Sequence, residues 1–242
     1  MTVIRQSRQV SLPIWNDFEN NVFYCRLPWN PKSPDFGMAT TGVVDSIKRN
    51  LDMTTLAPTI YTRTFPRAAV WLRDVILILL GALFVAALAQ VEIPLPFTPV
   101  PITGQTFGVL LVGAALGSKR GASSLATYLT LGMIGLPFFA GGAHGLDIVL
   151  GATGGYLIGF VIAAYVIGLL AERGLERSVR TSILPFLAGT VIIYLCGVTW
   201  LAVVLGSLSK ALAAGLIPFL IGDAIKLVAA ALVLPAAWKF AS

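Results

Sequence analysis

Six long apolar runs follow one another along the chain after Asp74, and short polar or Pro/Gly-rich segments separate them. Each run has about the 17 to 25 residues that an α-helix needs to cross the hydrocarbon core of a bilayer. The pattern therefore predicts an all-α integral membrane protein, with transmembrane helices over Val75–Val91, Ile102–Ser118, Gly121–Phe139, Ala152–Ala171, Ile183–Leu205 and Leu216–Trp238.

The connections between these predicted helices are of two kinds. Three are irregular and poor in basic residues: Ile93–Pro101, whose four prolines exclude regular helix, the Gly-rich Ala140–Gly151, and Ser207–Gly215. In a six-helix chain they alternate with the other connections, so they lie together at one end of the bundle. Irregular backbone gathered at one end is expected of a protein that presents a ligand pocket there.

Lysine and arginine are concentrated on the opposite side. Loops that stay in the cytoplasm carry the excess of these residues in membrane proteins. We therefore expect both termini in the cytoplasm of a multi-pass protein of the cell (plasma) inner membrane, with the irregular connections outside. Lys210 alone lies on the outer side, against nine basic residues on the inner side: Arg63, Arg67, Arg73, Lys119, Arg120, Arg173, Arg177, Arg180 and Lys239.

Residues 1–66 form a polar extension before the predicted helices. The extension has no apolar run of spanning length and no apolar stretch after a basic start, which argues against a secretory signal. Its acidic residues, such as Asp17, Glu19 and Asp35, argue against a transit peptide. We expect residues 1–66 to be a flexible cytosolic extension and residues 67–242 to form the membrane domain.

The composition excludes other classes of protein. The chain is 57% hydrophobic and 12% charged, with a mean hydropathy of +0.85, whereas about a quarter of the residues of a soluble domain are charged. The net charge of +6 comes without a basic face interleaved with aromatic residues. The expected environment is therefore the lipid bilayer, and no nucleic acid partner is expected.

Two opposite charges, Asp223 and Lys226, stand inside the last apolar run. Their spacing of i and i+3 places them on one helix face. A charge in a spanning segment costs at least about 2.5 kcal/mol, so such a pair indicates a functional site by default. Together they offer an anionic acceptor and a cationic donor to a small polar group that has both N–H and C=O. The alternative is an ion pair that serves only helix packing.

Small residues form other patterns with two interpretations. Pairs such as Gly104/Gly108, Gly113/Gly117 and Gly155/Gly159 fit close helix packing. At Gly151–Tyr156, glycines meet the start of a helix, where free N–H groups favour an anion such as a carboxylate. Gln105 lies just inside the second run and is expected to reach a ligand or to bond to a neighbouring helix.

Motifs for covalent chemistry are missing from the sequence. There is no phosphate-binding loop of the type Gly-x-x-x-x-Gly-Lys-Ser/Thr, no Gly-x-Ser-x-Gly nucleophile motif and no metal-ligand spacing. We therefore expect no catalytic residue, no metal and no cofactor, and a protein that is not an enzyme.

Five segments in register resemble the BioY family, the biotin-binding S components of energy-coupling-factor (ECF) transporters. The similarity covers roughly Val70 to Trp238. The segments are Ile93-Pro-Leu-Pro-Phe-Thr-Pro-Val-Pro-Ile-Thr-Gly-Gln-Thr-Phe107, Leu116-Gly-Ser-Lys-Arg-Gly121, Gly135-Leu-Pro-Phe-Phe-Ala-Gly-Gly142, Gly154-Gly-Tyr-Leu-Ile-Gly-Phe160 and Gly222-Asp-Ala-Ile-Lys226.

The resemblance implies a six-helix protein that captures biotin from outside and works with a membrane coupling subunit and two cytosolic ATPases. Asp223 and Lys226 match the family's acidic and basic pair, which holds the ureido ring of biotin. Ala82 and Ala86 match the small-residue face that docks on the coupling subunit. Further positions that match segments of the family's pocket are Phe139, Gly141, Thr153, Gly155 and Tyr156, with Gln105 as an additional contact.

One departure from the family concerns the start of the fourth helix. Ala152 stands where the family commonly has proline, a residue that favours the first helical turn. The groups that hold the carboxylate end of biotin therefore stay open. The alternatives to biotin capture are an S component or secondary transporter for another small vitamin, a membrane enzyme and a structural scaffold.

Overall fold

The computed structural model describes residues 55–57, 60 and 70–241. The predicted extension over residues 1–66 lies outside the described residues, apart from residues 55–57 and 60. Among the described residues past 69, all regular secondary structure is helical except for one two-stranded hairpin. The elements are α3 (Val70–Ala89), β1 (Glu92–Ile93), β2 (Ile102–Thr103), α4 (Gln105–Leu116), α5 (Ser118–Met133), η1 (Ala140–Gly142), α6 (Leu146–Leu150), α7 (Gly154–Ala171), η2 (Leu175–Arg177), α8 (Val179–Leu205), α9 (Leu208–Gly215), η3 (Ile217–Phe219) and α10 (Leu220–Ala241).

The helices α3, α4, α5, α7, α8 and α10 match the six predicted helices, and the prediction of an all-α membrane bundle is confirmed. Within the described residues, four helical stretches are long and apolar enough to cross a bilayer: Trp71–Ala89, Gly154–Ala171, Val179–Leu205 and Leu208–Lys239. The helix α4 is shorter but apolar. The helix α5 is the most polar, because it includes Lys119 and Arg120, which were expected in a connection.

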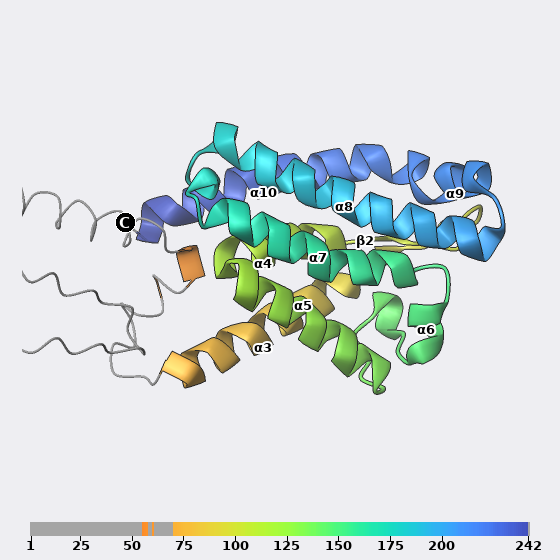
Figure 1. Cartoon of the computed structure of the whole chain (residues 1–242), viewed down its shortest axis with the longest axis horizontal. Helices are drawn as coiled ribbons and strands as arrows, with labels where there is room; N and C mark the ends of the chain where they lie inside the picture. Colours follow the sequence, from red (N-terminus) through yellow and green to blue (C-terminus); the bar gives the residue numbers. More distant parts are fainter. Residues whose placement is uncertain (1–54, 58–59, 61–69, 242) are drawn as a thin grey trace, which may run out of the picture. The chain divides into compact units, whose positions relative to one another are not determined.

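The alternating helices divide the bundle into two ends (Figure 1). At one end lie the β1–β2 hairpin, α6 and α9; we call this the loop end. At the other lie the start of α3, the α4–α5 junction, the α7–α8 connection and the last residues of α10. We call this the basic end, because its described basic residues are Arg73, Lys119, Arg120, Arg173, Arg177, Arg180 and Lys239. The predicted segregation of irregular and basic connections is confirmed.

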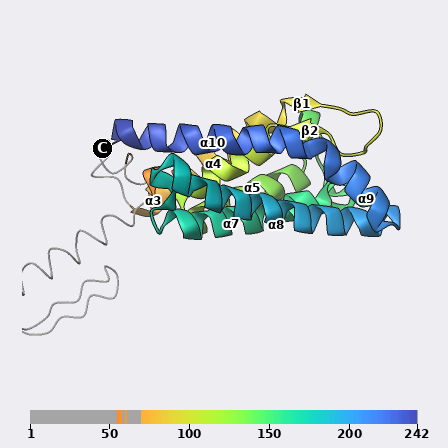
Figure 2. The ribbon, with the colours of Figure 1, turned by 90° about the horizontal axis from the view of Figure 1, so that it is seen from above.

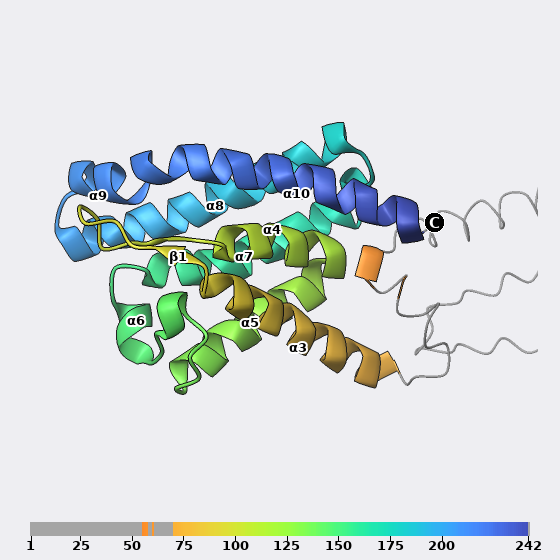
Figure 3. The same ribbon diagram turned by 180° about the vertical axis from the view of Figure 1, so that it is seen from behind.

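The proline-rich segment forms a wall at the loop end. It is the connection of an antiparallel hairpin in which Glu92 pairs with Thr103 and Ile93 with Ile102. The Thr98 hydroxyl donates to the Ala214 carbonyl of α9 over 2.7 Å, so the segment is held against a distant part of the chain. Figure 3 shows this connection reaching α9, and Figure 2 shows β1 and β2 beside the loop-end half of α10.

A single residue, Gly117, separates α4 from α5. Its φ of +84° belongs to a region that side chains other than glycine rarely adopt, and it allows the chain to reverse without a loop. The Glu172 carboxylate at the end of α7 accepts hydrogen bonds from the Ser118 N–H and hydroxyl, both over 2.8 Å. A carboxylate at a helix start satisfies free N–H groups and interacts favourably with the helix dipole.

Close helix packing uses the small-residue pairs found in the sequence. A Cβ on Gly113 would lie 3.0 Å from the Ala164 backbone of α7, and one on Gly159 would lie 3.1 Å from Cys196 of α8. A Cβ on Gly108 would meet Leu88 of α3 at 3.0 Å. These contacts confirm the packing interpretation of the glycine pairs.

The small-residue face of α3 also serves the core of this chain. Ala82 and Ala86 are 0% and 6% exposed and belong to the buried apolar cluster, while α3 packs against α4 and α5. The exposed stripe of α3 contains large residues such as Leu79 and Leu83. Helices of the same chain thus cover Ala82 and Ala86 in this structure, and their contact with a coupling subunit stays a prediction.

The core includes residues that the sequence assigned to the extension. Thr55 and Leu56 are 4% and 6% exposed, and Leu56 belongs to the same buried cluster as the helices. A Cβ on Gly117 would lie 3.3 Å from the Thr55 methyl group, which places Thr55 at the α4–α5 junction. Thr55 and Leu56 therefore pack with the helices of the bundle.

Candidate ligand-binding cavity

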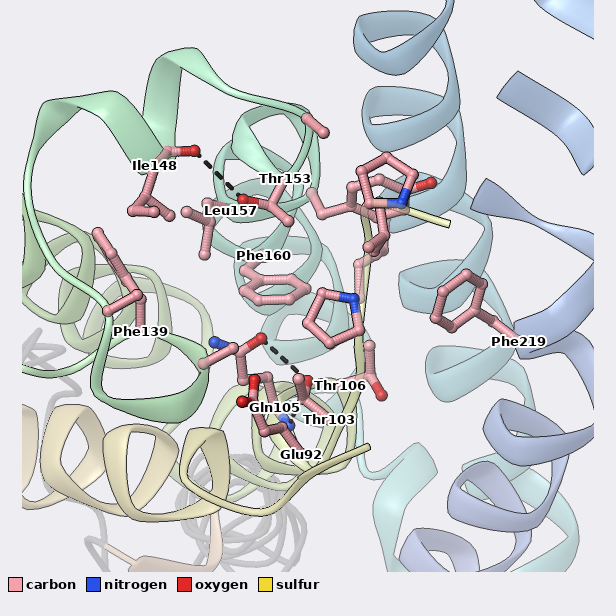
Figure 4. A pocket seen from close by; sticks show the side chains of 18 of the residues that line it. Glu92, Thr103, Gln105, Thr106, Phe139, Ile148, Thr153, Leu157, Phe160 and Phe219 are labelled. Atoms are coloured by element: carbon pink, nitrogen blue, oxygen red, sulfur yellow. Dashed lines mark hydrogen bonds between the residues drawn. The ribbon is translucent and has the colours of Figure 1, made fainter. Parts of the chain in front are cut away.

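A cavity of about 310 Å³ lies between α4, α7, α8 and α10 and is bordered by loop-end segments. Ligand pockets in proteins range from about 300 to 1,000 Å³, so this one suits a small molecule. In Figure 4, Phe139 and Ile148 lie on one side of the cavity and Phe219 on the opposite side, with Phe160 and Leu157 between them. Six of the predicted ligand-binding residues line it: Gln105, Phe139, Thr153, Tyr156, Asp223 and Lys226.

Asp223 and Lys226 form the polar centre of the cavity. The Lys226 Nζ lies 2.8 Å from Asp223 Oδ1, and the two side chains are 19% and 9% exposed. Both come from the first two turns of α10, where their i, i+3 spacing places them on one face. The two side chains thus lie on one helix face, as predicted, and form an ion pair there.

Two hydroxyl groups complete the network around this pair. The Thr106 hydroxyl donates to Asp223 Oδ1 over 3.0 Å and accepts from Lys226 Nζ, also over 3.0 Å. The Tyr194 hydroxyl donates to Asp223 Oδ2 over 2.6 Å. The helices α4, α8 and α10 thus meet in one hydrogen-bond network, and these contacts fix the rotamer of the carboxylate.

The network leaves bonding capacity for a ligand. An ionised carboxylate has about four lone-pair sites, and an ammonium group has three donors. Asp223 accepts three hydrogen bonds from the protein, and Lys226 donates two. One acceptor site on Asp223 and one donor on Lys226 therefore stay available beside each other. A ligand group with adjacent N–H and C=O satisfies both.

Thr106 and Tyr194 do not stand out in the sequence as site residues. Hydroxyl groups are common in membrane helices, where they often donate to the backbone one turn earlier, as Thr190 does to the Phe186 carbonyl over 2.9 Å. Only the packing of α4 and α8 against α10 brings Thr106 and Tyr194 to Asp223. The available sequence signal was weak: Thr106 follows Gln105, and Tyr194 is the one tyrosine of its apolar run.

Aromatic side chains form much of the apolar wall. Phe139 is almost fully buried and meets the Tyr128 ring edge-on, with 5.7 Å between centroids. The Tyr156 ring packs against Gly197 of α8, and its hydroxyl donates to the Gly215 carbonyl over 2.7 Å. Tyr156 therefore has a structural function in addition to its place in the wall.

Gln105 is buried, and each end of its amide has a partner in the protein. Its carbonyl oxygen accepts from the Thr103 hydroxyl over 2.9 Å, and its NH₂ group donates to the Tyr128 hydroxyl. The predicted bond to a neighbouring helix is thus present, to Tyr128 of α5, and Gln105 also lines the cavity.

Gly141 and Gly155, which the resemblance places in the ligand site, are not among the residues that line the cavity. A Cβ on Gly155 would collide with Trp200 and the Cys196 carbonyl, so this glycine serves the contact between α7 and α8. Gly141 has a φ of +60° within η1, and a Cβ there would point at the Glu92 carboxylate. Their neighbours Thr153 and Phe139 line the cavity instead.

The structure gives little support to an anion site at the start of α7. The N–H of Gly154 donates to the Gly151 carbonyl, and the N–H groups of Tyr156 and Leu157 donate to the Thr153 carbonyl. The Thr153 hydroxyl donates to the Ile148 carbonyl over 3.2 Å (Figure 4). Most N–H and hydroxyl groups of this turn therefore already donate to oxygens of the chain and are not available to an anion.

A second buried carboxyl group lies at the basic end, outside the spanning segments. Glu176 in η2 is fully buried, and neither carboxyl oxygen has a hydrogen-bond partner among the residues that the structure describes. Burial raises the pKa of Glu176 to about 7, although the nearby Arg177 and Trp238 favour its charged form. In the part of the chain that the structure describes, no three His, Cys, Asp or Glu side chains gather to hold a metal ion.

The fold and the cavity define a multi-pass membrane protein with a polar ligand site at the loop-end half of its bundle. The model of the BioY family matches residues 54–242, and the chain belongs to this family. The match begins next to Thr55, in agreement with the burial of Thr55 and Leu56.

Named relatives and a solved structure agree with this assignment. The chain is 45% identical over 141 residues to the biotin transporter BioY of Thermotoga maritima, covering 58% of this chain and 82% of the relative. It is 41% identical over 169 residues to the biotin transporter BioY of Rhizobium etli, covering 66% and 90%. The crystal structure of an S component for biotin from an ECF-type ABC transporter matches with a TM-score of 0.64 and 29% identity, over 69% of this chain and 92% of that one.

Proposed function

We propose that this protein takes up biotin as the substrate-capture (S) component of an ECF transporter. The observation that carries the proposal is the pair of open bonding positions on Asp223 and Lys226. Biotin contains a cyclic urea, in which N–H groups flank a carbonyl. The urea N–H donates to the Asp223 carboxylate, and its carbonyl accepts from the Lys226 ammonium. The function is transport and involves no covalent chemistry.

The other parts of the cavity suit the rest of the molecule. The fused sulfur-containing ring and the aliphatic tail of biotin are apolar, and Phe139, Tyr156, Phe160 and Phe219 supply apolar surface. Gln105 and Thr153 add polar groups to the wall. A polar anchor within an apolar cavity gives orientation and specificity.

Orientation in the membrane follows from the two ends of the bundle. The basic end carries the excess of Lys and Arg, which supports a cytoplasmic position for this end and for both termini. The loop end and the entrance to the cavity then face outward from the inner membrane. A membrane coupling subunit and two cytosolic ATPases complete the transporter, in keeping with the similarity to an S component of an ECF-type ABC transporter.

Equilibrium binding of labelled biotin to the purified full chain in detergent tests this function. Desthiobiotin keeps the cyclic urea and should compete, whereas lipoate keeps the carboxylate tail and sulfur but lacks the urea and should not. Buried polar groups discriminate strongly against ligands that leave them unpaired. Failure of biotin to bind, or equal competition by lipoate, would refute the proposal.

A further inference from the structure

The charges that line the cavity are unequal. Four charged side chains border it: Glu92, Asp147, Asp223 and Lys226. Lys226 is the only cation among them, and it is paired with Asp223 over 2.8 Å. Two carboxylates, Glu92 on β1 and Asp147 on α6, are left over. The cavity therefore has an excess of negative charge at its loop-end border.

These two carboxylates are exposed and have no neutralising partner. Within the described part of the chain, the carboxylate of neither Glu92 nor Asp147 forms a hydrogen bond or an ion pair. His144 belongs to the same connection as Asp147, but its ring lies near the Gly142 carbonyl and it does not line the cavity. A charged group at this border consequently meets a negative potential.

The placement of the urea on Asp223 and Lys226 would direct the tail of the cargo toward this border. With its urea on Asp223 and Lys226 of α10, a ligand extends across the cavity toward the wall that contains Phe139 and Ile148, opposite Phe219 (Figure 4). Asp147 precedes Ile148 in α6 and lines the same wall. The start of α7 offers little compensation to a negative tail, because three of its first N–H groups already donate to backbone oxygens.

We propose that the cavity prefers biotin derivatives with a neutral or cationic tail, that is biotin amides, over biotin with its free carboxylate. This inference rests on the proposed function, because it assumes that the urea is held by Asp223 and Lys226. The class of cargo includes biotin joined through an amide to an amine, such as the ε-amino group of lysine. Glu92 and Asp147 are the specificity-determining residues.

The test compares biotin with biotinamide, which has nearly the same shape but no charge. Each exposed carboxylate is expected to change the affinity for a charged tail about two- to five-fold. At low salt, the two carboxylates together should therefore make biotinamide bind about 4- to 25-fold more tightly than biotin. In the Glu92→Gln/Asp147→Asn double variant, the affinity for biotin should rise and that for biotinamide should not change. Asp74→Asn at the basic end makes the same chemical change away from the cavity and should leave both affinities unchanged.

The salt dependence of the unmodified protein gives a second measurement that needs no variant. Salt screens exposed charges over about 10 Å at 0.1 M. Raising the salt concentration from about 0.02 to 0.5 M should therefore tighten the binding of biotin and leave the binding of biotinamide unchanged. The inference is overturned if biotin binds as tightly as biotinamide at low salt, or if the double variant leaves their ratio unchanged. If neither compound binds, the proposed function fails as well, so the two failures are distinguishable.

Discussion

Replacing Asp223 by asparagine changes the site at the atoms where the ligand is expected to bind. The carboxylate accepts hydrogen bonds from Thr106, Lys226 and Tyr194. Asparagine keeps one oxygen and replaces the other by an NH₂ group, which then faces a donor. The Lys226 ammonium also loses its counterion.

The expected loss of biotin affinity follows from the hydrogen bonds that the Asp223→Asn variant no longer forms. A hydrogen bond to a charged group contributes about 1.5 to 3 kcal/mol, and every 1.4 kcal/mol is about tenfold in affinity. Loss of one urea N–H bond to the carboxylate therefore predicts biotin binding weaker by about 10- to 150-fold. Breaking a buried ion pair costs about 3 to 5 kcal/mol of stability. We expect less here, because the Lys226 side chain keeps 19% exposure.

Isothermal titration of the purified variant with biotin measures the loss, and thermal unfolding shows whether the variant is folded. The matched control is Asp74→Asn, which removes a carboxylate paired with Arg120 over 2.8 Å at the basic end. The control should bind biotin within twofold of the unmodified protein, about the precision of such a titration. A folded Asp223→Asn variant that binds biotin within about threefold of the unmodified protein would refute the reasoning.

Three other changes test the surroundings of the site and the fold. Tyr194→Phe should weaken biotin binding by about 3- to 10-fold in the same titration, because the carboxylate loses a positioning donor; an unchanged affinity would contradict this. Gly168→Ala should lower the stability by about 1 to 3 kcal/mol in thermal unfolding, because its Cβ would collide with the Ser118 backbone, whereas Gly222→Ala adds a methyl group in open space. Since burial raises the pKa of Glu176 from 4.5 to about 7, the folded state holds its proton more tightly, so stability should be complete below pH 4.5 and fall until about pH 7. Glu176→Gln should flatten this dependence in unfolding measured against pH; an unchanged profile would exclude Glu176 as its source.

The helices and the charged centre of the site were predictable because their physical signals are local. A spanning helix needs a continuous apolar run, and the number of residues in such a run is fixed by the bilayer. Asp223 and Lys226 stand out because charges inside such a run are costly and need a reason. Both signals are present within about 20 residues of sequence.

Other features depend on contacts between distant segments. The hydroxyls of Thr106 and Tyr194 gain their function only when α4 and α8 dock on α10. Gly155 and Thr153 are two residues apart, yet one faces α8 and the other the cavity, and sequence spacing alone did not decide which. The small residues Ala82 and Ala86 suit both an internal contact and an external one, and the structure shows the internal contact.

The ion pair between Asp223 and Lys226 has an electrical consequence. Moving one elementary charge through a potential of 100 mV takes about 2.3 kcal/mol. Because Asp223 and Lys226 sum to zero, this pair adds no such work when its position in the membrane field changes. Any voltage dependence of uptake then comes from the border carboxylates Glu92 and Asp147 and from the cargo, which brings one negative charge as free biotin and none as its amide.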